Sequence, residues 1–188
     1  MPTQLLNPST ESRDVELLAP ELQDKVQLLR ERCESRGLVL GVGTTVRGPE
    51  AQARLWCRSR TPEDVARRHD LLVRIAPTLA GLLRPEWAAI GPQATVHLPG
   101  QSWHQWGQAL DVYVDVGGKA VWEGSVAMAV AKLAKEVGLE HSYSRKEWEP
   151  KSRHWHAQLS RLETPLMVRG LVDSWADLEQ VMLERFEL

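Results

Sequence analysis

The chain has 188 residues, of which 43% are hydrophobic and 26% are charged, and its formal net charge is -2. These values are ordinary for a globular domain and exclude an overall electrostatic attraction to nucleic acid. Two cysteines, Cys33 and Cys57, are too few for a disulfide scaffold or a Cys-rich zinc finger. No apolar run in the sequence approaches the roughly 20 residues of a membrane-spanning helix.

The first half of the chain is predicted to be helical. Residues 1–14 are polar, and we expect a flexible arm there, followed by a single domain over 15–188. Three prolines stand where helices are expected to begin, because proline is favoured at the first helical position. The predicted elements are a helix from Pro20 towards Gly37, a short buried strand over 38–42, a helix from Pro49, and a helix from Pro62 that Pro77 breaks.

The second half is predicted to add a small sheet. The expected elements are strands over 94–98 and 109–114, a turn at Gly117-Gly118, a helix over 125–137, a strand over 154–159, and a C-terminal helix from about Leu171. This order predicts an α+β fold in which a small antiparallel sheet packs with helices.

A histidine and an aspartate flank the start of the second predicted strand. They belong to Ser102-x-His104-x-x-Gly107-x-Ala109-x-Asp111. The glycine lets the backbone turn closely, and the alanine shares the strand face of the aspartate. An imidazole and a carboxylate can bind one zinc ion, but a catalytic zinc site needs a third protein ligand.

His154 and His156 are two residues apart on a predicted strand, so they face the same way, and either could be the third ligand. Two histidines and one carboxylate also suit the iron(II) of an oxygenase. We disfavour that class, because its first histidine and its acid usually lie closer together in sequence.

The segment SWHQWGQALD resembles the S-x-H-x-x-G-x-A-x-D signature of the zinc D,D- and L,D-peptidases of bacterial cell walls. These are the VanY-like and VanX-like carboxypeptidases, the dipeptidases and the phage endolysin endopeptidases of the Hedgehog/D,D-peptidase fold. Residues 41–52 resemble the family's segment in which a strand and an arginine precede a helix. WHAQL at 155–159 resembles its closing segment, and the resemblance covers about residues 20–160.

The resemblance implies a Zn²⁺ cofactor and assigns roles to individual residues. His104, Asp111 and His156 would be the metal ligands, and Arg47 would face the substrate's carboxylate or the developing oxyanion. The family's catalytic acid precedes the last ligand by three residues, but Arg153 stands there in this chain. We therefore expect Glu149 to be the base, with His154 orienting it or donating a proton. Further substrate-contacting residues are expected at Gln52, Ser102, Trp103, Trp106, Tyr113 and Trp155.

The implied function is a zinc metallopeptidase that hydrolyses peptidoglycan stem peptides or cross-links, as a carboxypeptidase or an endopeptidase. The alternative is a zinc-containing, peptidoglycan-binding domain of the same fold that has lost its base. The residues before position 15 show no Sec-type signal pattern. We therefore expect the protein to be made in the cytoplasm and to reach the periplasm or cell wall through lysis, a phage or a secretion system. It would act there as an endolysin or a secreted effector. We also expect it to be a monomer.

Overall fold

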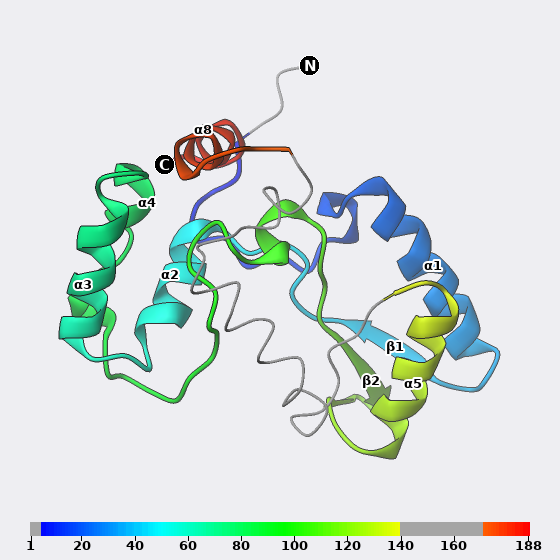
Figure 1. Cartoon of the computed structure of the whole chain (residues 1–188). Coiled ribbons are helices and arrows are strands. Elements are labelled where there is room, and N and C mark those ends of the chain that lie inside the picture. The colour runs from blue at the N-terminus through cyan, green and yellow to red at the C-terminus, as the bar shows by residue number, and fades with distance from the viewer. Residues whose placement is uncertain (1–4, 140–170) are drawn as a thin grey trace. The chain divides into compact units, whose positions relative to one another are not determined.

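The computed structural model describes residues 5–139 and 171–188 of the chain (Figure 1). Its architecture is α+β, as predicted, with a three-stranded antiparallel sheet in the order β1-β2-β3 and several helices. The chain folds into two compact units. The described part of unit 1 comprises residues 5–11, 47–105 and 171–188, and that of unit 2 comprises residues 12–46 and 106–139. The single domain over 15–188 stays a prediction.

Unit 2 contains the sheet and two helices that pack on one of its faces. Its elements are η1 (Val15–Leu17), α1 (Pro20–Glu34), β1 (Val39–Val42), β2 (Val112–Val116), β3 (Lys119–Val121) and α5 (Ser125–Glu136). Figure 1 shows α1 in blue and α5 in yellow-green beside β1 and β2. Leu29 and Cys33 of α1, Val114 of β2, and Val130 and Leu133 of α5 form the buried core of this layer.

Side-chain alternation gives the sheet two different faces. Gly41 of β1 pairs with Tyr113 of β2 in the antiparallel register. Leu40 and Val114, on the alternate positions, belong to the core under α1 and α5. Since successive side chains of a strand point to opposite faces, Gly41 and Tyr113 lie on the face turned away from these two helices.

Unit 1 is helical in its described part. It contains α2 (Pro49–Cys57), α3 (Pro62–Leu72), α4 (Pro77–Ala80), η2 (Pro85–Trp87) and α8 (Trp175–Arg185). α8 is tied to α4 by a buried hydrogen bond, in which the Leu79 backbone N–H donates to the Glu179 carboxylate at 2.9 Å. Leu6 and Phe186 form a backbone bridge that fixes the N-terminal segment beside the end of α8. None of the described helices is both long and apolar enough to cross a membrane.

The helix starts predicted at Pro20, Pro49 and Pro62 are confirmed. The Thr61 hydroxyl accepts a hydrogen bond from Asp64 N–H at 3.2 Å and caps α3. The helical stretch is interrupted near Pro77, as predicted, but α3 already ends at Leu72 and Pro77 opens α4. The C-terminal helix begins at Trp175, later than predicted, because Ser174 is its N-cap. Residues 5–14, expected to be a flexible arm, include Ser12 and Asp14, whose carbonyl groups accept hydrogen bonds from the Thr45 hydroxyl.

One predicted strand is absent, and two others differ from the prediction in burial or in bounds. Residues 94–98 form no strand, because the Thr95 hydroxyl accepts a hydrogen bond from the backbone N–H of His97 at 3.1 Å, which replaces ladder pairing. The strand predicted over 38–42 is present as β1, but it is not buried as expected, since Val39 is 62% exposed. Asp111 lies immediately before β2 rather than within a strand over 109–114. The strand predicted over 154–159 lies outside the described residues.

Both cysteine thiols are buried, and burial raises their pKa values. The pKa of Cys57 rises to about 11, and that of Cys33 is also raised. At about pH 8, roughly a thousandth of the Cys57 thiol is therefore ionised, and the thiolate is the reactive form. We expect Ellman's reagent to titrate neither cysteine within minutes in the native protein and both in denaturant. Rapid native labelling would contradict their assignment to the core.

Candidate functional site

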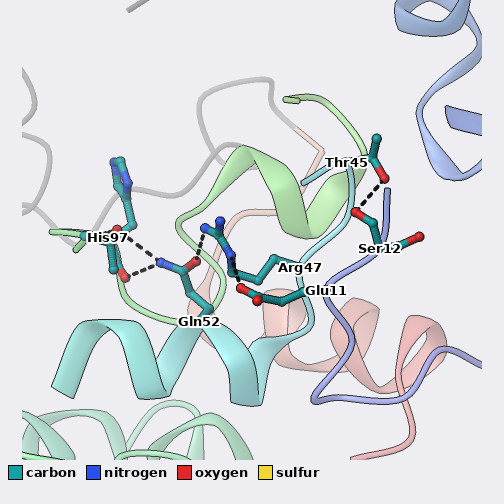
Figure 2. A network of polar contacts seen from close by, with 7 residues as sticks. Glu11, Ser12, Thr45, Arg47, Gln52 and His97 are labelled. Atoms are coloured by element: carbon teal, nitrogen blue, oxygen red, sulfur yellow. Dashed lines mark hydrogen bonds and ion pairs between the residues drawn. The ribbon is translucent and has the colours of Figure 1, made fainter. Parts of the chain in front are cut away.

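Arg47 follows β1 and lies beside the segment that carries His104. Its backbone N–H donates to the His104 carbonyl oxygen at 3.3 Å. The guanidinium group donates from Nε to Glu11 Oε1 at 3.1 Å and from Nη1 to Gln52 Oε1 at 3.3 Å (Figure 2). The side chain of Arg47 is only 14% exposed. Among the described residues, backbone pairing, the Glu11 carboxylate and the Gln52 amide thus set its position.

Gln52 fixes one nitrogen of that guanidinium from within α2. The side chain is fully buried. Its amide nitrogen donates to the His97 carbonyl oxygen at 2.7 Å and to the Thr95 hydroxyl at 3.3 Å. Because the nitrogen is used there, the amide oxygen must face Arg47, as Figure 2 shows. Gln52 therefore joins Arg47 to the segment that contains Thr95 and His97.

His104 lies in the short 3₁₀ helix η3 (Trp103–Trp106) and is half-buried. His97 is close enough to respond to its charge. Burial and, as a smaller contribution, the charge of His104 lower the pKa of His97 to about 4. The His97 imidazole is therefore neutral near pH 7. The imidazoles of His97 and His104, both in unit 1, are thus close enough to interact electrostatically.

The loop before η3 is held by a glutamine of that helix, Gln105. Gln105 Oε1 accepts hydrogen bonds from the backbone N–H groups of Gly100 at 2.7 Å and Ser102 at 3.4 Å. Ser102 is buried and Trp103 is partly buried. Trp106, in unit 2, is also buried. The substrate contacts expected from these three residues stay predictions.

Asp111 and two aromatic rings lie on the face of the sheet opposite α1 and α5. Gly43 N–H donates to the Asp111 carbonyl at 2.8 Å. A Cβ atom at Gly43 would lie 2.9 Å from the Trp122 ring and 3.1 Å from Asp111 Cβ, and one at Gly41 would lie 2.2 Å from the Tyr113 ring. The Tyr113 and Trp122 rings are 5.0 Å apart, and Trp122 is 48% exposed. The two glycines therefore provide the space in which these rings and the aspartate lie.

Gly107 shows why the histidine–aspartate motif contains a glycine. Its φ is +66°, and a Cβ atom there would lie 2.7 Å from the Leu17 carbonyl oxygen. Its own carbonyl accepts a hydrogen bond from Ala19 N–H at 2.8 Å. The close backbone turn predicted from the sequence is confirmed.

We expect Gly107→Ala to destabilise the protein by about 3 kcal/mol, because it adds a backbone clash to an unfavourable φ. Gly117→Ala is the matched control, since its φ of +61° is similar but nothing lies within 4 Å of the added Cβ. This control should lose only about 1 kcal/mol. Urea unfolding of both variants measures the difference, and equal losses would contradict the steric role of Leu17.

Glu149, His154, Trp155 and His156 lie outside the described residues. Within residues 5–139 and 171–188, no group of three or more His, Cys, Asp or Glu side chains could hold a metal ion. The described candidates for such a site are His104 in unit 1 and Asp111 in unit 2, so the metal-ligand set stays a prediction.

The sequence did not reveal the contributions of Glu11, Thr95 and His97. Each lacks a motif, and Glu11 lies in a polar segment that was expected to be an arm. The only signal that could have suggested Gln52 as an internal contact was its place beside the apolar positions of α2. The structure brings Arg47, Gln52 and the backbone of His104 together, as Figure 2 shows for the first two.

Comparison with known proteins adds the family. The family model of VanY, described as D-alanyl-D-alanine carboxypeptidase, matches residues 15–160. No curated protein and no solved structure matches the chain significantly. The family match covers well over half of the sequence, including both the arginine segment and the histidine–aspartate motif. The chain therefore belongs to the VanY family of D-alanyl-D-alanine carboxypeptidases, which are peptidases that act on peptidoglycan.

Proposed function

We propose that this protein is a zinc-dependent carboxypeptidase that removes the terminal D-alanine from peptidoglycan stem peptides. The family match supports the substrate class. The observation that carries the proposal is the hydrogen bond from Arg47 N–H to the His104 carbonyl at 3.3 Å. This bond places the backbone of Arg47 beside that of His104, the histidine with the expected spacing from Asp111. A carboxypeptidase needs both a group that binds the substrate's carboxylate and a metal ligand, and these two residues are the proposed ones.

His104, Asp111 and His156 are the proposed zinc ligands. Two imidazoles and one carboxylate are a donor set that zinc accepts in catalytic sites. The glycine at position 43 supports this assignment, because a Cβ atom there would crowd Asp111 at 3.1 Å. When bound, zinc supplies Lewis acidity, which makes water a nucleophile at neutral pH and polarises the scissile carbonyl.

Arg47 is proposed to bind the free carboxylate of the terminal D-alanine. Its planar guanidinium matches a carboxylate better than an ammonium group does. The contacts with Glu11 and Gln52 set the guanidinium plane before substrate arrives, which reduces the entropy lost on binding. If the group instead faces the developing oxyanion, the same rigidity would favour the transition state.

Glu149 is proposed as the general base and His154 as its partner. Arg153 occupies the position of the family's usual acid, so the carboxylate must come from elsewhere in the chain. Glu149 would accept a proton from the attacking water and donate it to the leaving amine. Ser102, Trp103, Trp106, Tyr113 and Trp155 remain proposed contacts for the rest of the stem peptide.

The substrate lies outside the cytoplasm, so we place the site of action in the periplasm or cell wall. Release by lysis, by a phage or by a secretion system would bring the protein there. A role as an endolysin or as a secreted effector fits this route equally well.

Muropeptide analysis tests the function. Purified pentapeptide muropeptides are incubated with the protein, with and without a chelator, and the products are identified by mass spectrometry. We expect tetrapeptides and free D-alanine, and the chelator should stop their release. New amine termini within cross-links would instead indicate an endopeptidase. Binding without any cleavage, unchanged by Glu149→Gln, would favour the domain that has lost its base.

A further inference from the structure

Glu11 is an acidic partner of Arg47 in the described part of the chain, and it lies outside the residues that the family model matches. The match begins at residue 15. The Glu11 carboxylate nevertheless accepts the Arg47 Nε hydrogen bond at 3.1 Å. The family pattern therefore does not account for this contact, which the N-terminal segment of this chain supplies.

Backbone pairing holds this N-terminal segment in place. Glu11 and Arg47 form an antiparallel bridge, and the backbone N–H of Gly48 donates to the Thr10 carbonyl at 2.7 Å. A Cβ atom at Gly48 would lie 2.1 Å from the Pro8 carbonyl oxygen, so the close approach depends on glycine there. Backbone pairing on both sides of the contact therefore places Glu11 beside Arg47.

We propose that Glu11 is a positioning residue, which together with Gln52 holds the Arg47 guanidinium in the orientation that receives the substrate's carboxylate. This proposal rests on the function proposed above for Arg47. Glu11 and Gln52 engage two different nitrogens, Nε and Nη1, so together they restrict rotation of the planar group. Either contact alone would leave the plane less restricted.

A carboxylate beside Arg47 could instead compete with the substrate's carboxylate. The geometry favours positioning, because Glu11 binds at Nε and is itself 52% exposed, so its charge is screened by water. A competitor is expected to weaken substrate binding, whereas a positioning residue strengthens it. The two roles therefore predict opposite signs for the effect of removing Glu11.

The test compares Glu11→Ala, Glu11→Gln and wild type in the full-length, zinc-loaded protein. Binding of an acyl-D-Ala-D-Ala peptide and of its C-terminal amide is measured by calorimetry, and kcat and KM are measured by D-alanine release. Glu50→Gln is the matched control, because Glu50 also contacts the N-terminal segment, through Ser9 at 2.6 Å, and also pairs with an arginine, Arg54, at 2.7 Å.

We expect Glu11→Ala to weaken binding of the free acid on the order of fivefold, to leave binding of the amide unchanged, and to raise KM more than it lowers kcat. Glu11→Gln should recover part of the loss, because its amide oxygen still accepts from Nε. The control should match wild type, and thermal unfolding should show all variants folded.

Three results would overturn the proposal. They are tighter binding of the free acid by Glu11→Ala, equal losses for acid and amide, and wild-type binding that does not distinguish the two ligands. Failure of the proposed function has another signature: wild type would prefer the free acid, and Glu11→Ala would reduce that preference, while no D-alanine is released.

Discussion

Zinc binding and D-alanine release are both expected to be lost when His104 is replaced by alanine. Removing one of three protein ligands leaves the metal with too few donors. The loss of affinity should exceed the 10–100-fold that is typical of replacing an outer-shell partner. Elemental analysis of the purified protein gives the zinc stoichiometry, and an amino-acid oxidase assay gives D-alanine release. Asp111→Ala should behave in the same way.

His69→Ala is the control for these two substitutions. His69 lies in α3, where its imidazole is 3.3 Å from the Asp70 carboxylate and has no place in the proposed site. This variant should retain one zinc ion per chain and full activity. Retention of stoichiometric zinc by a folded His104→Ala protein would refute the ligand assignment.

Replacing Arg47 is expected to give the second large effect. Arg47→Ala should lower kcat/KM by about 100-fold, the range found when one preorganised donor to a developing charge is removed. Arg47→Lys should recover only part of this, because an ammonium keeps the charge but lacks the planar fork that Glu11 and Gln52 orient.

Steady-state kinetics with a D-Ala-D-Ala peptide separates the two possible roles of Arg47. A rise in KM alone would indicate binding of the ground-state carboxylate, whereas a fall in kcat would indicate contact with the oxyanion. Zinc content should remain at the wild-type level in both variants. A change below about threefold in kcat/KM would contradict any direct role of Arg47 in substrate recognition.

The helices could be predicted because their start signals are local. Proline at the first position and a capping threonine act within one turn, so Pro49 and Thr61 identified two helix starts without tertiary information. The strand expected over 94–98 failed because apolar alternation does not reveal that Thr95 bonds its own backbone. Predicting that would require knowledge of Gln52, which also contacts Thr95 and lies far away in sequence.

The same distinction between local signals and tertiary contacts applies to the residues of the candidate site. Arg47, His104 and Asp111 could be predicted because they stand in short motifs of fixed spacing. Glu11 could not, since one acid in a polar segment carries no periodicity and its partner is distant in sequence. The contacts that orient a catalytic group come from tertiary structure, whereas the group itself is often marked by its local pattern.

Gly41 and Gly43 leave room for the side chains of residues that are distant in sequence. The space a Cβ atom would need at these positions belongs to Tyr113 and Trp122. A relative with a bulky residue in place of Gly41 must therefore shrink or move the ring opposite it. We expect the identities at positions 41 and 113 to vary together during evolution, so that the single exchange is harmful and the paired exchange is tolerated.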